Sequence, residues 1–201
     1  LIQPVREAVA RTCNPGPRFL FVAGGVGPVG GSQVVLNLVD ALNDLGYSAA
    51  FAHLHTGSYA HKFRSRSAPL ALTPAELARD IEERVGWPRG EPAMAIATSF
   101  ASGKIAASIC ERRPHFRPVA WWQDREDLFE RPDNRAPHPS EFTDYLAIPR
   151  AVSVSRWVRD TAGPDLGVHP EWHVINPTVD SDFLAARRGP RRCGPCPRAA
   201  A

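Results

Sequence analysis

Residues 19–51 read FLFVAGGVGPVGGSQVVLNLVDALNDLGYSAAF, and this stretch decides the fold. The apolar run at 19–23 has the length and composition of a buried strand. A glycine-rich turn follows it, and apolar side chains then recur at helical spacing over residues 32–45 until Gly46, a residue typical of helix C-termini. Residues 47–54 form a second strand-like run. The stretch therefore predicts a strand, a glycine loop, a helix and a second strand.

The rest of the chain continues this alternation. Further strands are predicted at residues 93–98, 118–122, 151–155 and 172–175. Helices are predicted at residues 73–85, opened by a Thr73–Glu76 capping box, at 103–112, at 142–146 and from about 156. Strands that alternate with helices build a parallel sheet with helices on both faces. We therefore predict a Rossmann-like α/β fold, in which ligands bind at the carboxyl ends of the strands.

The composition of the 201-residue chain, 43% hydrophobic and 22% charged, is that of a soluble protein with one large or two small domains. The net charge is +3, but five arginines lie in the last fifteen residues, and without them it is 3 − 5 = −2. This balance argues against nucleic acid as the main partner. With no secretory leader and no apolar run long enough for a transmembrane segment, we expect a cytoplasmic location.

Three kinds of site compete for the glycine loop. Gly25, Gly27 and Gly30 fit a dinucleotide fingerprint, but no acid that could hold the ribose occurs between Asp44 and Glu76. A phosphate loop would need a lysine where Gly31 stands. There remains a loop whose glycines let a ligand approach the backbone at a helix N-terminus. The alternative is a tight turn that binds nothing.

Three segments in this order resemble one family. They are GGSQVVLNLVDALNDLGYSAAF at residues 30–51, VAWWQDREDLFE at 119–130, and VSVSRWVRDTAGPDLGVHPEWHVINPTVDSDFL at 152–184. The first and third are similar to the acceptor domain of the group 1 retaining glycosyltransferases, which have the GT-B fold. The second is similar to a Gln-Asp-x-Glu-x-x-Phe segment of a rhamnosyltransferase-like branch, although its acid-to-aromatic spacing here is only approximate.

The resemblance implies one half of a two-domain enzyme. Residues 1–18 would be an N-terminal extension and 19–184 the Rossmann-like acceptor domain, while the donor-binding domain would be absent. Residues 185–201, rich in Arg, Pro and Cys, predict a disordered tail in which the Cys193–Cys196 pair is not a redox motif. A nucleotide-sugar would be the donor substrate, and no cofactor is expected.

Candidate site residues are those that the resemblance and the strand ends bring together. Asp124 is the candidate catalytic carboxylate, with helix capping as the alternative. The candidate substrate-binding residues are Gly30, Gly31, Ser32, Gln33, His53, Trp122, Gln123 and Ser155. Ser155 equally suits a helix N-cap, and of Trp121 and Trp122 alternation predicts one in the core and one facing a ligand. His53 and His55 lack further ligands, so no metal site is expected.

These observations favour the acceptor-side domain of a glycosyltransferase of polysaccharide biosynthesis, of the hexosyltransferase type. It would move a sugar from a nucleotide-sugar to a glycan or lipid-linked acceptor. As a truncated or partial chain it is expected to be inactive alone, and a second polypeptide could carry the donor domain. Two alternatives stay open: a non-catalytic binding subunit of a two-chain transferase, and a nucleotide-dependent oxidoreductase fragment.

Overall fold

The computed structural model describes residues 16–24, 30–54, 65–128 and 142–176. Their centre is a seven-stranded sheet in which all neighbouring strands run parallel, in the order β3-β2-β1-β4-β5-β6-β7. The strands are β1 (Arg18–Ala23), β2 (Ala49–Leu54), β3 (Leu70–Leu72), β4 (Ala93–Ala97), β5 (Phe116–Trp122), β6 (Arg150–Ser153) and β7 (Glu171–Val174). The chain order reverses between β1 and β4, which is the switch point of a doubly wound sheet. The predicted Rossmann-like α/β fold is confirmed.

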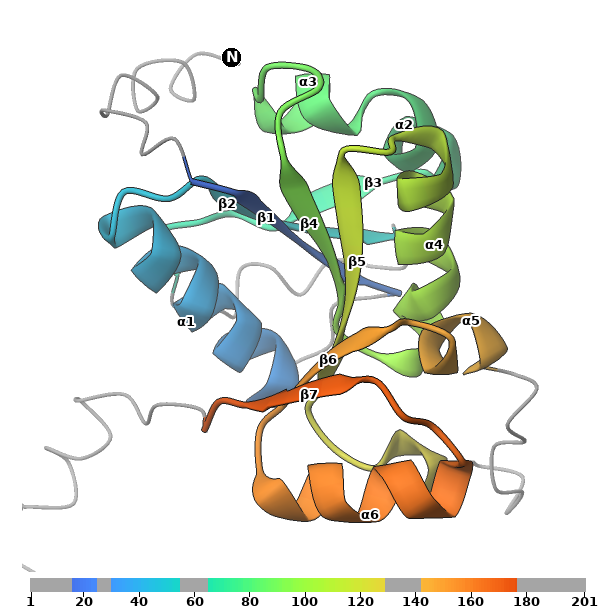
Figure 1. Ribbon diagram of the computed structural model, residues 1–201. Helices are drawn as coiled ribbons and strands as arrows, with labels where there is room; N and C mark the ends of the chain where they lie inside the picture. The colour runs from blue at the N-terminus through green and yellow to red at the C-terminus, as the bar shows by residue number, and fades with distance from the viewer. Residues whose placement is uncertain (1–15, 25–29, 55–64, 129–141, 177–201) are drawn as a thin grey trace, which may run out of the picture.

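Helices cover both faces of this sheet (Figure 1). Helix α1 (Gly30–Asp44) packs on one face. The opposite face carries α2 (Pro74–Arg79), α3 (Ile81–Val85), α4 (Gly103–Arg112), α5 (Thr143–Leu146) and α6 (Arg156–Leu166). Two short 3-10 turns, η3 (Phe100–Ser102) and η4 (Glu126–Leu128), follow the ends of β4 and β5. Both turns therefore lie at the carboxyl edge, where ligands of such sheets bind.

Alternation along the strands divides the core into two layers. On the α1 face, Phe21 and Trp121 pack edge to face with 5.9 Å between ring centroids. On the other face, Trp122 packs against Phe100 and Tyr145, with centroids 5.2 and 5.1 Å away. Successive tryptophans thus stabilise opposite layers, because neighbouring side chains of a strand point to opposite faces.

The helix predicted at residues 73–85 is divided in two. Its capping box is confirmed: Thr73 Oγ1 accepts a hydrogen bond from Glu76 N at 3.2 Å, and the Glu76 carboxylate accepts from Thr73 N at 2.8 Å. The prediction of one helix is wrong, because Asp80 (φ −127°) ends α2 and precedes α3. Long-range bonds are made at the break: the Arg113 guanidinium donates to Arg79 O, the last residue of α2, and to the buried carboxylate of Glu82 in α3.

Some predictions fall outside the described residues. They include the extension before residue 16, His55, Phe129 and the tail at 185–201. Within the described ranges, no helix has the length and apolar character needed to cross a membrane.

Candidate functional site at the carboxyl edge

Gly31 and Gln123 meet at the carboxyl edge of the sheet, beside the switch point. A Cβ atom added to Gly31 would lie 2.9 Å from Gln123 Oε1. The Gln123 amide also donates from Nε2 to Thr98 O at 3.1 Å, and Thr98 N in turn donates to Val22 O at 3.0 Å. One glutamine after β5 thus contacts the first turn of α1 and the end of β4. Residues 92 positions apart in sequence therefore lie side by side, at the edge of the sheet where the sequence predicts a site.

The backbone at Gly31 lies close to the Gln123 side chain. Among the described residues, the glycines with positive φ are Gly46, Gly86, Gly90 and Gly167, and Gly31 is not among them. The position therefore does not need glycine for a left-handed backbone. A Cβ atom at this position would displace the Gln123 amide, which can move aside because it is the tip of a flexible side chain.

Gly30, Ser32 and Gln33 lie in the first turn of α1. The helix begins at Gly30, two residues earlier than predicted, and its first turn contains no acidic residue. The positive end of the helix dipole is therefore not neutralised by a carboxylate from that turn. Gln33 donates from Nε2 to Asn37 Oδ1 at 2.7 Å, which orients its amide along the helix. This turn suits a hydroxyl or an anion.

Asp124 stands next to Gln123 with its side chain exposed. Its Oδ1 accepts a hydrogen bond from Arg125 N at 2.8 Å, so the carboxylate orders the turn that leads into η4. It has no further hydrogen-bond partner among the described residues. An exposed carboxylate with one remaining oxygen can accept a hydrogen bond from a ligand hydroxyl.

Arg125 anchors this turn, a role that sequence reasoning missed. Its buried guanidinium binds Asp127 through two bonds of 2.8 and 2.6 Å and Asp165 of α6 through one of 2.9 Å. The bond to Asp127, followed by that to Asp165, raises the pKa of Arg125 above its usual range. A bidentate pair fixes the geometry as well as the charge. The chain on either side of Asp124 is thus held in place.

Glu126 is a second carboxylate at this edge that sequence reasoning missed. Its Oε2 accepts a hydrogen bond from Phe100 N, at the start of η3, at 2.9 Å. Burial is the main cause that raises the pKa of Glu126 to about 7. The hydrogen bond from Phe100 lowers this pKa, and the negative charges of Asp124 and Asp127 raise it by a smaller amount. The only sequence signal was the density of acids after a buried strand, which does not say which acid is buried.

Three predicted site residues lie near the same edge but are buried or bonded within the fold. Trp122 is 2% exposed within the aromatic cluster, and Trp121 is 5% exposed, so both rings are inside and the predicted division into one core and one ligand-facing ring is wrong. His53 is 2% exposed, and its Nδ1 donates to Leu54 O at 3.0 Å. Ser155 accepts a hydrogen bond from Val158 N at 3.2 Å and is the N-cap of α6.

Metal ligands do not gather in the described part of the chain. No group of three or more His, Cys, Asp or Glu side chains lies there in a position to hold an ion.

Solved glycosyltransferases share this fold. An alpha-glucosyltransferase in complex with UDP and a 13-mer DNA containing a HMU base aligns with a TM-score of 0.51 and 13% identity, over 84% of this chain and 44% of that one. The same kind of enzyme in complex with UDP aligns with a TM-score of 0.50 and 12% identity, over 85% and 46%. The fold is that of a GT-B glycosyltransferase domain. No family model matches the sequence, and no curated protein matches it significantly.

The likeness concerns one part of those enzymes. The chain spans less than half the length of the two solved structures. At 12–13% identity the comparison shows only that the fold is shared. UDP and DNA are ligands of those proteins.

Proposed function

We propose that this domain is the acceptor-side half of a glycosyltransferase that moves a sugar from a nucleotide-sugar to a glycan or lipid-linked acceptor. The contact between Gly31 and Gln123 carries the proposal. It joins two of the segments that resemble group 1 retaining enzymes, and it does so beside the switch point, where open α/β sheets bind ligands. The GT-B architecture of the solved neighbours supports the same assignment.

The residues have distinct roles in this proposal. Backbone N–H groups in the first turn of α1, around Ser32, bind hydroxyls of the acceptor. Gln123, which is bonded to Thr98 O and lies beside this turn, contacts the sugar with its amide. Asp124 accepts a hydrogen bond from the reacting hydroxyl and orients it. The Gln123–Asp124 pair belongs to the segment similar to the rhamnosyltransferase-like branch, which we propose as the nearest type.

The donor belongs to the other half. A nucleotide-sugar is bound by its diphosphate, and we propose that a second domain or a separate polypeptide holds it as a substrate, without a further cofactor. The chain alone is therefore expected to transfer no sugar, because binding the donor in position supplies much of the rate. Robust turnover by the purified 201-residue chain would contradict this division.

The cell location and the partners follow from the same reasoning. We propose a cytoplasmic location for the protein. No nucleic-acid partner is proposed, because the chain without the five arginines near its end carries a formal charge of 3 − 5 = −2.

Backbone NMR of the purified chain tests the site directly. Neutral oligosaccharides are expected to shift the amide signals of Gly31 and Gln123, whereas NAD and UDP-glucose are expected to leave them unchanged. Gly31→Val should abolish the sugar-induced shifts, because its side chain displaces the Gln123 amide. Ala41→Val, on the exposed side of the same helix, is the matched control and should bind normally. Shifts caused by NAD would instead favour the oxidoreductase alternative.

A further inference from the structure

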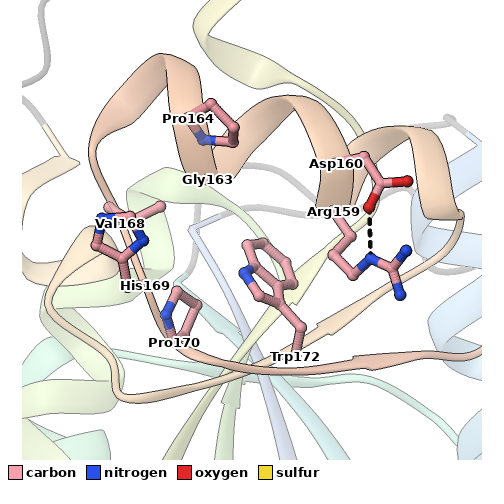
Figure 2. A pocket seen from close by; sticks show the side chains of 8 residues that line it. All are labelled: Arg159, Asp160, Gly163, Pro164, Val168, His169, Pro170 and Trp172. Carbon is pink, nitrogen blue, oxygen red and sulfur yellow. Dashed lines mark hydrogen bonds and ion pairs between the residues drawn. The ribbon is translucent and has the colours of Figure 1, made fainter.

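The hollow between α6 and β7 has the chemistry of a sugar-binding site. It is open to solvent, has a volume of ≈ 420 Å³, and is closed at one end by the residues that precede β7 (Figure 2). Pro170 of the hollow lies directly before β7, at the amino ends of the parallel strands. The switch-point site lies at the carboxyl ends, so the two sites are at opposite edges of the sheet. We propose that this hollow binds a neutral saccharide.

Trp172 forms the floor of the hollow (Figure 2). Its ring is half-buried and leans on Trp122, with 5.5 Å between ring centroids and 54° between planes. The ring is therefore oriented before any ligand arrives, which lowers the entropy lost on binding. Its indole N–H has no hydrogen-bond partner among the described residues. A flat apolar ring with an unused donor suits one C–H face and one hydroxyl of a pyranose.

Gly163 and Pro164 of α6 line the helix side of the hollow and leave it open. This dipeptide is unfavourable in a helix, because glycine is flexible and proline lacks an N–H group. A Cβ atom on Gly163 would lie 3.3 Å from Val168 O and 4.0 Å from Trp172 Nε1, so glycine leaves the space above the indole free. Pro164 cannot donate to the carbonyl of Asp160, which leaves that acceptor without its usual helical partner.

The charges in the hollow favour a neutral ligand. Arg159 Nε binds Asp160 Oδ1 at 2.7 Å, so the guanidinium is already paired with a carboxylate (Figure 2). Phosphates and nucleotides are bound most strongly by unpaired cations, and the arginine of the hollow is paired; the other basic side chain of the lining is His169. Pyranose rings present apolar C–H faces and hydroxyls together, and matching walls exist here: Trp172 and Pro170 are apolar, and the ion pair is polar. The volume of ≈ 420 Å³ falls in the range of about 300–1,000 Å³ for small-ligand pockets.

The test follows the indole ¹H–¹⁵N signal of Trp172 in the full chain, assigned with Trp172→Phe. Maltotriose, cellotriose and mannotriose are titrated separately, with glycerol as the polyol control. We expect at least one trisaccharide to shift this signal saturably, while the indole of Trp157, on the same helix but outside the hollow, stays unchanged. Gly163→Ala narrows the hollow and is expected to weaken binding about tenfold or more, which the fitted Kd reports. Thr161→Ala, outside the lining, is the matched control and should bind normally.

Each outcome decides the proposal. A saturable shift that Gly163→Ala weakens and Thr161→Ala leaves intact supports it. Three inert trisaccharides would overturn it, as would a shift that glycerol reproduces. A shift caused by a proline-rich peptide and by no sugar would also overturn it, and would assign the hollow to peptides. The Trp172 indole signal tests the hollow, and the Gly31 and Gln123 amide signals test the switch-point site. A negative result for either site therefore does not count against the other.

Discussion

Glu126→Gln separates the charge of a partly buried carboxyl from its hydrogen bond. In the wild type, Glu126 Oε2 accepts from Phe100 N at 2.9 Å. Glutamine offers the same acceptor oxygen without a charge, so the bond to η3 is kept. The change in stability then reports the energy of ionising this group in the folded protein.

The magnitude follows from the pKa. Burial raises the pKa of Glu126 from the usual 4.5 to about 7 in the folded state, a difference of about 2.5 units. At 1.36 kcal/mol per unit, this corresponds to about 3 kcal/mol of unfolding free energy. Between these pH values the folded state keeps the proton and the unfolded chain releases it. Stability is therefore fully present below 4.5 and falls as the pH rises through about 7.

Urea unfolding at pH 5 and pH 8 measures this effect. Glu126→Gln and the wild type should be similar at pH 5, and at pH 8 the variant should be the more stable by about 2–3 kcal/mol. Glu83→Gln, at a carboxylate that is 74% exposed, is the control, and its difference from wild type should not change between the two values. A Glu126→Gln difference that is the same at both pH values would refute the reasoning.

Three further variants test the packing around the site. Gly31→Ala should lower stability by only about 1 kcal/mol, since the flexible Gln123 amide can move aside and lose one hydrogen bond, and a double-mutant cycle with Gln123→Ala should show the coupling. Gly103→Ala should cost about 2 kcal/mol or more in thermal unfolding, because its Cβ would lie 2.6 Å from the backbone of Tyr145. Arg125→Met should cost about 3 kcal/mol in urea, because it leaves Asp127 buried without its cation, and a loss below 1 kcal/mol would contradict the anchoring role.

Local patterns were sufficient for most of the fold. The apolar run at 19–23, the helical spacing after it and the Thr73–Glu76 capping box are set by neighbours in sequence, and all appear in the structure. Strand β3 (Leu70–Leu72) was missed because three residues are too few to show a period of two. The break at Asp80 was missed because the bonds around it, to Arg79 O and to Glu82, come from residues of later segments.

The edge of the sheet at which the candidate site lies was predictable from the sequence, and the burial of its individual residues was less so. Parallel strands put residues 31 and 123 at one edge, and the structure joins them there. Whether each tryptophan is buried depends on which helices cover its face of the sheet, and the alternation of side chains along a strand does not show this. With α1 on one side and α4 and α5 on the other, both Trp121 and Trp122 are enclosed. The burial of Glu126 likewise comes from tertiary packing.

The turn after β5 is held from three directions, and this decides what Asp124 can do. Gln123 binds the end of β4 on the α1 side, Arg125 binds α6 through Asp165, and Glu126 binds the start of η3. Asp124 accepts a hydrogen bond from Arg125 N just before η4, and it is an exposed carboxylate on a backbone fixed on both sides. Such a group loses little freedom when it binds a hydroxyl, which is the property an acceptor-orienting residue requires.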